Sequence, residues 1–403
     1  MAPACCREDG CDVPENLTSG QVRRKVMPGP SVSVLMPTYK HQAYIAQAIE
    51  SVLAQRFGDF ELVITDDHSP DQTYAVAEAY ARKDPRVRVF RNPQNLGLSA
   101  NYTRCFQNAY PQSGYFIILP SDDWWMPETL EVLVATAEQN PRATFVHADG
   151  YKVKDHGVVP YLSIFRHLPP QGLHRGLREL YSNNYIMVQT TLVRRSLFQR
   201  FHCRPFLFDP DYVFISDYQL WLELLGRGAQ AYYLPRPLAY FREHPESHTI
   251  PRHILPRMIE EVAMFEQKLP HSTPPDLEPY RHRAVIGRLA AIGFLYLEAK
   301  EPAKAQPYLE RAARESPRLR WDVMVARTIS RLPMPKSTRA QLWHLVLEAV
   351  GGKPGTRISL VFLQRWNQGN TTIITALLND PTLAVRALQD AIPPLLYLFG
   401  GSR

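Results

Sequence analysis

The sequence predicts an α/β fold, with a mainly parallel sheet flanked by helices, followed by an all-α C-terminal domain. Short apolar runs alternate with amphipathic stretches over residues 31–150, and such alternation produces right-handed crossovers between parallel strands. The 403 residues exceed one compact domain and suit two or three. Apolar residues make up 45% and charged residues 21%, so general disorder is excluded.

The elements follow one another in order from residue 31. Apolar runs predict strands at 32–36, 61–65, 87–91, 115–119 and 144–147. Apolar residues spaced three and four apart predict helices near 42–54, 71–82, 99–109, 127–139, 176–183 and 217–227. After Pro256 the composition is helical, interrupted by proline pairs at 274–275 and 393–394. Since ligands of parallel sheets bind beyond the carboxyl ends of the strands, we expect a site there.

We expect a mobile tail over residues 1–30, which are rich in Pro, Gly and charge and show no periodicity. A sheet domain is expected over 31–254 and a helical domain over 255–403. One segment of the helical domain has the spacing of a tetratricopeptide helix pair, although Lys300 replaces its usual second glycine; the matching positions are Gly293, Tyr296, Ala305, Leu309, Ala312 and Pro317. No second copy follows at a 34-residue step, so an ordinary helical hairpin remains the alternative.

The composition predicts a cytoplasmic protein. Mean hydropathy is −0.27, and no uncharged apolar stretch approaches the ~20 residues of a spanning helix. The opening MAPACCREDGCD has no apolar core, so we expect no secretory signal. The five cysteines form no paired framework: Cys5, Cys6 and Cys11 lie in the tail, and Cys105 and Cys203 stand alone.

The net charge of +7 is unevenly distributed along the chain. Residues 1–250 carry 25 Lys and Arg against 26 Asp and Glu, whereas residues 251–403 carry 21 against 13. An N-terminal region with balanced charge and clusters of acidic residues suits a cation-binding site better than a nucleic-acid-binding site. The basic C-terminal third is compatible with peripheral contact at the inner face of a membrane, with a partner protein, and with a solvated helical face.

Two predicted strands run into pairs of carboxylates, Asp66-Asp67 and Asp122-Asp123. If both strands are parallel members of one sheet, the four carboxylates face one crevice, where they repel unless a cation compensates. Mg²⁺ or Mn²⁺ with a bound diphosphate is the natural occupant. The alternative is that each Asp only caps the next helix: Asp71, for instance, precedes one, and Asp122 or Asp123 could cap the helix near Pro127.

Over residues 31–250 the chain resembles the family 2 glycosyltransferases, whose catalytic domain has the Rossmann-like glycosyltransferase A fold. The resemblance rests on several segments in the family's order: SVSVLMPTYKHQAYIAQAIESVLAQ, FELVITDDHSPDQT, NPQNLGLSANYTRC, YFIILPSDDWWMPETLE, FISDYQLWLELLGRG and YYLPRPLAYFREHPES. It implies a nucleotide-sugar half over 31–150 and an acceptor half over 151–254.

The resemblance also implies roles for single residues. Tyr39 would stack on the nucleotide base beside Thr38, and Asp66 or Asp67 would accept a hydrogen bond from the base or ribose. Asp122 would hold the ribose and Asp123 would ligate the cation. The implied nucleotide-sugar set is Pro37, Thr38, Tyr39, Asp66, Asp67, Asn95 and Asp122, and the implied metal set is Asp122, Asp123 and His244. The chain departs from the family at Pro120, where many relatives have another Asp.

Asp217 would be the general base that deprotonates an acceptor hydroxyl. A competing interpretation is a capping box formed by Ser216 and Gln219, which would place Asp217 in the first turn of a helix. The helix dipole there favours an acid and lowers its pKa, which weakens a base. Relatives usually have Glu-Asp where this chain has Ser216-Asp217. Asp217 would therefore have to serve as the general base without a neighbouring acid.

Three residues are weaker acceptor candidates. Trp124 and Trp125 could present indole faces to a sugar, or could be core or rim residues. Gln189, in YIMVQTTLVRRS, resembles a polar residue of the family near the acceptor.

The predicted function is metal-dependent, inverting transfer of a sugar from a nucleoside-diphosphate sugar, with a UDP-sugar favoured. The acceptor would be a hydroxyl of a glycan, lipid-linked or protein acceptor in surface polysaccharide or glycoconjugate synthesis. The alternative is a catalytically degenerate nucleotide-sugar-binding or scaffold protein that acts through its helical tail. A dinucleotide oxidoreductase is excluded because no Gly-x-Gly-x-x-Gly follows a strand. A nucleotidyltransferase would need a glycine-rich phosphate loop after the first strand, where this chain has PTYKHQAY.

Overall fold

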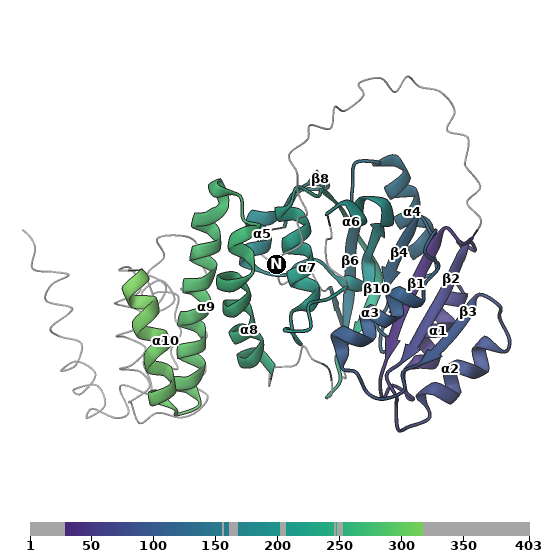
Figure 1. Ribbon diagram of the computed structural model, residues 1–403, viewed down its shortest axis with the longest axis horizontal. Coiled ribbons are helices and arrows are strands. Elements are labelled where there is room, and N and C mark those ends of the chain that lie inside the picture. Colours follow the sequence, from purple (N-terminus) through teal and green to yellow (C-terminus); the bar gives the residue numbers. More distant parts are fainter. Residues whose placement is uncertain are drawn as a thin grey trace, which may run out of the picture.

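The structure is a computed structural model that describes residues 29–154, 157–160, 168–201, 207–245, 247 and 253–316. Figure 1 shows a sheet with its flanking helices at one side of the molecule and a row of helices extending away from it. The predicted tail before residue 29 and the predicted helices after residue 316 lie outside the described residues.

Within the described residues, ten strands form one sheet in the order β3-β2-β1-β4-β9-β6-β10-β5, with β7 beside β6 and β8 beside β10. Their bounds are Val32–Thr38 (β1), Phe60–Asp66 (β2), Val87–Arg91 (β3), Tyr115–Ile118 (β4), Trp124–Trp125 (β5), Phe145–Lys154 (β6), Gly157–Pro160 (β7), Gly172–His174 (β8), Thr191–Arg194 (β9) and Ala231–Arg242 (β10).

The sheet is mostly parallel, as predicted. β1 pairs in parallel with β2 and β4, β2 with β3, and β6 with β10. Since β4 and β6 are both antiparallel to β9, they also share one direction. β1, β2, β3, β4, β6 and β10 therefore point the same way. The neighbours β1, β2 and β4 end at one edge of the sheet, where the functional site was expected.

The described helices are Ile45–Leu53 (α1), Thr73–Ala81 (α2), Leu98–Asn108 (α3), Thr129–Gln139 (α4), Leu177–Ser182 (α5), Arg195–Phe201 (α6), Ser216–Gly226 (α7), Ile254–Gln267 (α8), Glu278–Glu298 (α9) and Pro302–Glu315 (α10). The six helices predicted before residue 250 are all present, with ends that differ by a few residues. Within the described chain, no helix is long and apolar enough to cross a membrane.

The core follows the two-residue period of the strands. In β1, Val34 and Met36 join an apolar cluster with α1 and α4, whereas Leu35 joins a second cluster with α3. The apolar face of α1 (Ile45, Ala48, Ile49 and Val52) is buried, as its spacing predicts. The sheet is thus covered by helices on both faces, which is the layering expected for parallel strands.

The second cluster continues out of the sheet into the helical region. It contains Trp221 of α7, Phe265 of α8, Leu289 of α9 and Leu309 of α10. In Figure 1, α8, α9 and α10 stand successively farther from the sheet. α8 begins at the boundary predicted near residue 254, but these helices share a continuous apolar core with the sheet domain.

Helices α9 and α10 form a hairpin joined by residues 299–301. Gly293 lies against Leu309, and a Cβ at position 293 would be 2.5 Å from Leu309 Cδ2, so the close approach of the two helices needs a glycine there. The helical hairpin is therefore present. Its identification as a tetratricopeptide unit is not confirmed and stays a prediction, and Pro317 lies outside the described residues.

Candidate active site

The site begins where β1, β2 and β4 end side by side. The Ser121 hydroxyl donates to Thr38 Oγ1 at 2.8 Å and lies 2.8 Å from Nδ1 of His41. The Asp67 N–H donates to the carbonyl oxygen of Thr38 at 2.9 Å. These bonds fix the loops that follow three neighbouring strands at the carboxyl edge of the sheet, where ligands of parallel sheets bind.

Asp67 holds a loop rather than facing open space. Its carboxylate accepts the N–H groups of Leu96 and Gly97, each at 2.9 Å, and the side-chain amide of Asn92 at 2.8 Å. Asn95 belongs to the same loop, and its amide donates to the Asp67 carbonyl oxygen at 3.3 Å. The loop of the predicted Asn-x-Gly segment therefore sits on the end of β2 because Asp67 binds it there.

Asp66 differs from its neighbour in having one carboxylate oxygen without a partner. Oδ2 accepts the Ser69 N–H at 3.0 Å and lies 3.3 Å from the Arg91 guanidinium. Oδ1 is buried and has no hydrogen-bond partner among the described residues. Because a buried acceptor without a donor is costly, a ligand that donates a hydrogen bond would stabilise this arrangement.

The residues at the end of β1 have different exposures. Pro37 and Thr38 are buried, whereas the ring of Tyr39 is 38% exposed. Lys40 follows in a left-handed turn with φ +58°, and its N–H donates to Ser69 Oγ at 3.0 Å. Tyr39 is thus the one of the three that can offer an aromatic face to a ligand.

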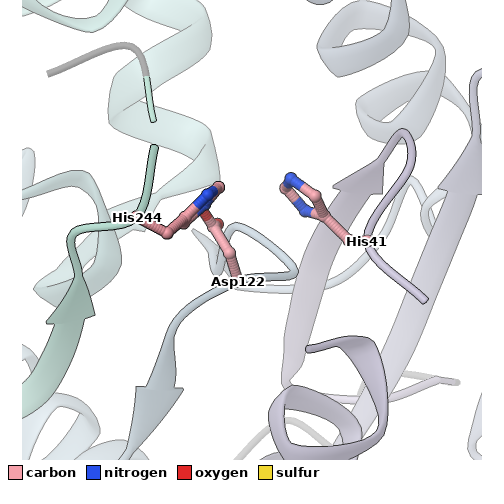
Figure 2. Close-up of side chains that lie close together, drawn as sticks. All are labelled: His41, Asp122 and His244. Carbon is pink, nitrogen blue, oxygen red and sulfur yellow. The ribbon is translucent and has the colours of Figure 1, made fainter. Parts of the chain in front are cut away.

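Asp122, His244 and His41 come together from three different loops (Figure 2). One ligand atom from each lies within 4.8 Å of the other two, and this is the group of possible metal ligands found within the described residues. Nε2 of His244 is 3.1 Å from Asp122 Oδ2. The donor set, one carboxylate and two imidazoles, is chemically suited to a divalent cation.

The two carboxylates that follow β4 have opposite pKa shifts. Burial alone would raise the pKa of Asp122, but the hydrogen bond from His244 and the nearby charge of His41 lower it below its usual value. Burial raises the pKa of Asp123 well above its usual value, and the charge of Asp122 adds to this effect. Of the two carboxyl groups, Asp122 therefore ionises more readily than Asp123.

Asp123 lies deeper than Asp122, with 1% of its surface exposed. Its Oδ1 accepts the Arg242 N–H at 2.8 Å and its Oδ2 accepts the Gln189 amide at 2.6 Å. Gln189, predicted near the acceptor, is itself buried and holds Asp123. Neither Asp122 nor Asp123 caps α4, whose first turn has no side-chain cap, so the capping alternative is wrong for this pair. Asp71, by contrast, accepts the Thr73 N–H at 3.1 Å at the start of α2.

The two tryptophans after Asp123 have different environments. Trp125 is 3% exposed and its indole N–H donates to the Gln189 carbonyl oxygen at 2.7 Å, so it is a core residue and presents no face to a sugar. Trp124 is partly exposed, stacks on Tyr240 at 5.0 Å between ring centroids, and has the Arg242 guanidinium 4.6 Å from its ring. Trp124 alone of the pair stays a candidate for sugar contact.

Asp217 stands in the first turn of α7, as predicted, but without a capping box. Ser216 donates its hydroxyl back to the Tyr212 carbonyl oxygen at 2.7 Å, and α7 has no side-chain cap. The Asp217 carboxylate accepts the Tyr218 N–H at 2.8 Å and the Asn184 amide at 3.2 Å. Two donors therefore orient the carboxylate of Asp217, a residue that is partly exposed as a whole.

The pKa of Asp217 differs from the expectation. The helix dipole was expected to lower it, but burial raises the pKa above its usual value, and the hydrogen bonds from Tyr218 and Asn184 only partly oppose this. Desolvation of the charged form outweighs the helix start at this position. A raised pKa suits a general base, because it increases the affinity of the carboxylate for a proton.

Tyr102 of α3 connects the two groups of carboxylates. Burial raises its pKa, and the negative charges of Asp122, Asp217 and Asp123 raise it further, so all three charges act on its hydroxyl. The start of α3 also contacts the start of α7, where Ser99 Oγ is 3.3 Å from Ser216 Oγ. The start of α7, which carries Asp217, is therefore joined to α3, and the charges of the predicted donor-side and acceptor-side acids both act on Tyr102.

Two residues of the site were not among the sequence candidates, His41 and Tyr102. His41 lies in PTYKHQAY, where a lone histidine in a polar loop carries no signal of its own. Tyr102 lies on the amphipathic helix after the Asn-x-Gly segment, where an aromatic residue predicts core packing. Only the assembled sheet brings His41 next to Asp122 and exposes Tyr102 to the charges of Asp122 and Asp217.

Comparison with known proteins agrees with this geometry. Residues 33–201 match the family described as Glycosyl transferase family 2. A Bacillus subtilis protein named "Uncharacterized glycosyltransferase EpsJ" is 30% identical over 224 residues, which are 55% of this chain and 63% of that protein. The match thus covers less than two thirds of this relative. The "Putative teichuronic acid biosynthesis glycosyltransferase TuaG" of B. subtilis is 28% identical over 214 residues, 53% of this chain and 79% of that protein.

Solved structures share the fold at low sequence identity. The structure of S. aureus TarS 1–349 in complex with UDP-GlcNAc aligns with a TM-score of 0.53 and 19% identity, covering 79% of this chain and 91% of that one. The mannosyltransferase PcManGT from Pyrobaculum calidifontis, in complex with GDP-Man and Mn²⁺, aligns with a TM-score of 0.52 and 16% identity, covering 85% and 88%. The predicted glycosyltransferase A fold is confirmed by these structures, and residues 33–201 are similar to glycosyl transferase family 2.

Proposed function

We propose that this protein is a metal-dependent, inverting glycosyltransferase that moves a sugar from a nucleoside-diphosphate sugar to an acceptor hydroxyl. The observation that carries the proposal is that the charges of Asp122, after β4, and Asp217, at the start of α7, both act on Tyr102 of α3, whose first turn contacts the start of α7 through Ser99 and Ser216. One acid lies in a cation-binding cluster and the other is oriented as a base. This division of roles is what sugar transfer from a diphosphate requires.

The donor would lie over the ends of β1 and β2. The exposed ring of Tyr39 can stack on a base. The buried Oδ1 of Asp66 has no hydrogen-bond partner among the described residues and can accept a hydrogen bond from an N–H group of the base. Asp67 is engaged with the Asn95 loop, so between the two acids Asp66 is the one proposed to read the base. The complexes of TarS with UDP-GlcNAc and of PcManGT with GDP-Man support a nucleoside-diphosphate sugar as the donor class.

A divalent cation fits the residues present. Asp122 and His244 would hold it, because their ligand atoms are adjacent and Asp122 is charged. Asp123, whose oxygens are both engaged, would orient this loop. The cation, when bound, neutralises charge on the diphosphate as it leaves. The Mn²⁺ in the PcManGT complex supports a cation of this class.

Asp217 would accept the proton of the acceptor hydroxyl. The acceptor oxygen forms a bond to the anomeric carbon of the sugar as the bond from that carbon to the diphosphate oxygen breaks. The leaving electron pair stays on the nucleoside diphosphate, and the proton goes to the Asp217 carboxylate. Attack opposite to the leaving group inverts the configuration at the anomeric carbon.

The setting of the reaction is proposed from the relatives and the charge. The name of TuaG supports a role in surface polysaccharide or glycoconjugate synthesis. Residues 317–403 carry 11 Lys and Arg against 4 Asp and Glu, whereas residues 251–316 carry 10 against 9. Any attraction to an anionic membrane or a partner protein therefore belongs to the last 87 residues rather than to helices α8–α10.

Calorimetry with a panel of UDP- and GDP-sugars tests this function. We expect at least one donor to bind in Mn²⁺ and to bind more weakly in EDTA, since a cation held by Asp122 would offset the negative charge of the diphosphate. The matched variant is Asp66→Asn, which replaces an acceptor oxygen and should weaken donor binding. Asp211→Asn, at an exposed site paired with Lys268, should leave it unchanged. Equal affinity in Mn²⁺ and EDTA would contradict the metal role, and no binding by any donor would contradict the function.

A further inference from the structure

We infer that His41 is a third protein ligand of the cation, so that two imidazoles and one carboxylate hold it, and that the site prefers a first-row transition ion such as Mn²⁺ to Mg²⁺. The inference rests on the proposed function for the existence of the cation, and adds a ligand and a selectivity to it. Neither the position of His41 in the sequence nor its residue type predicted this role.

The placement of His41 is the first argument. Its ligand nitrogen lies within 4.8 Å of those of Asp122 and His244, and Figure 2 shows the His41 ring standing opposite the other two side chains. Ligands about 2.1 Å from an ion lie at most ~4.2 Å apart. A small contraction of the cluster would therefore let all three side chains bind one ion. Pro120, which precedes the acidic pair, offers no ligand atom.

The support around His41 is the second argument. His41 directly follows the left-handed turn at Lys40, and the backbone N–H of His41 donates to Thr73 Oγ1 at 2.9 Å. Its Nδ1 is 2.8 Å from Ser121 Oγ, which in turn donates to Thr38. A metal-binding imidazole commonly uses one nitrogen for the ion and the other for a hydrogen bond that sets the ring orientation. The contact with Ser121 is of this kind.

The rings around the cluster are also fixed. Tyr44 lies 4.8 Å from the His244 ring centroid and 6.0 Å from that of His41, and the two imidazoles meet edge to face at 5.9 Å. The backbone N–H of His244 donates to Ser247 Oγ at 3.0 Å. Both histidines are thus held close to Asp122 before any ion arrives, which is the preorganisation that a binding site needs.

The donor set predicts the preferred ion. Mg²⁺ requires oxygen ligands and retains several waters, whereas imidazole nitrogen favours transition ions. Two imidazoles and one carboxylate leave open positions on an octahedral ion, enough for two oxygens of a diphosphate. A site with Asp122 as the sole oxygen ligand from the cluster would therefore bind Mn²⁺ in preference to Mg²⁺.

Manganese binding without any nucleotide tests the inference directly. We would titrate the full-length protein with Mn²⁺ and follow free ion by electron paramagnetic resonance, for the wild type and for His41→Gln. Loss of a residue that only orients a ligand typically weakens metal affinity 10- to 100-fold, so loss of a ligand should raise the Mn²⁺ dissociation constant at least ~10-fold. The control His282→Gln, at a half-exposed site on α9, should match the wild type.

Pulsed resonance on the same samples counts the ligating nitrogens. The wild type should show modulation from two imidazoles and His41→Gln from one, and the wild-type spectrum alone decides the question if the variant does not fold. His41→Asp, which supplies an oxygen, should shift the preference toward Mg²⁺ in competition with Mn²⁺. A single imidazole in the wild type, or an unchanged Mn²⁺ affinity in folded His41→Gln, would overturn the inference.

These outcomes separate the inference from the proposed function. If donors bind and turn over while His41→Gln retains the full Mn²⁺ affinity, the function stands and the third ligand is wrong; His41 would then contact Ser121 or the diphosphate only. If Mn²⁺ binds through two imidazoles but no sugar donor binds, the ligand set stands and the function is wrong.

Discussion

At the scale of single residues, Asp217 shows how two effects on one carboxylate compete. The first turn of α7 favours its charged form, and burial disfavours that form more strongly, so its pKa is raised. The amide of Asn184 and the N–H of Tyr218 orient both oxygens without removing the proton affinity. Sequence patterns indicated the residue, but only the packing around α7 decides the sign of its pKa shift.

Asp217→Asn should lower turnover of the donor by at least ~100-fold, the lower range for a lost general base. Donor affinity should stay close to that of the wild type, because the proposed donor contacts lie at β1, β2 and β4. Calorimetry gives the affinity, and release of nucleoside diphosphate gives the turnover. Asp211→Asn is the matched control, and a wild-type rate for Asp217→Asn would rule out the assignment.

The same substitution should alter the pH dependence of stability. With a folded-state pKa above its ordinary value of 3.8, Asp217 contributes stability that is complete below the ordinary pKa and is lost as pH rises through the folded-state pKa. The neutral Asn does not lose this contribution. The free energy of unfolding of Asp217→Asn minus that of the wild type should therefore increase from about pH 4 toward neutrality. Urea unfolding at several pH values measures this difference, and a difference that falls with pH would contradict the raised pKa.

At the scale of single residues, the sequence identifies candidate site residues better than it predicts their hydrogen-bond partners. Asp66 and Asp67 were equivalent candidates because both follow the same strand. The structure separates them, since the backbone of the next loop folds onto Asp67 and leaves an oxygen of Asp66 without a partner. His41 could not be identified, because its role depends on residues about 80 and 200 positions away, Asp122 and His244.

At the scale of elements, the loop before α3 depends on one backbone conformation. Gly97 precedes α3 with φ +84°, and its N–H donates to Asp67 Oδ2 at 2.9 Å. A Cβ at this position would meet nothing within 4 Å. The requirement for glycine is therefore conformational rather than steric.

Gly97→Ala should destabilise the protein by about 1–2 kcal/mol, because a left-handed residue with a Cβ is strained. It should also weaken donor binding, since the strained loop leaves its position on Asp67. Gly58→Ala is the control, because that position has open space and no left-handed conformation. Urea unfolding and donor calorimetry measure the two effects. Equal stability of the two variants would show that the conformation of the loop is not required.

The elements predicted from sequence were those with a regular period. The five predicted strands and the helices before residue 250 are present because apolar spacing marks them. β10 was not predicted, since Pro235 and Pro237 interrupt it and its register with β6 shifts between Leu234 and Ala239. Proline has no backbone N–H to donate to a neighbouring strand. A segment with two prolines therefore does not look like a strand in the sequence, even where it forms one.

At the scale of the whole molecule, the sheet and the helices are joined by a buried arginine. Arg288 of α9 pairs with Glu261 of α8, and donates to the Tyr218 hydroxyl and the Tyr181 carbonyl oxygen, each at 3.2 Å. Tyr218 follows Asp217 directly. The helical region is therefore attached next to the proposed base, which the predicted division into separate domains did not anticipate.

Arg288→Met should lower the free energy of unfolding by about 3 kcal/mol, because Glu261 and two polar groups lose a buried partner. The control Arg82→Met removes an exposed pair with Glu78 and should cost about 0.5 kcal/mol or less. Urea unfolding of both variants measures the contrast. Equal midpoints would show that the contact between α9 and α7 contributes little to stability.

The central claim, metal-dependent sugar transfer at the carboxyl edge of the sheet, is tested most directly by donor turnover. Nucleotide sugars would be incubated with the protein in Mn²⁺ or in EDTA, and release of nucleoside diphosphate would be followed for the wild type and for Asp122→Asn. We predict that at least one donor is consumed in Mn²⁺, and that EDTA and Asp122→Asn each abolish the reaction. Consumption that is equal in EDTA or in Asp122→Asn would contradict the claim, as would binding of a donor without any turnover, which would favour a sugar-nucleotide-binding protein.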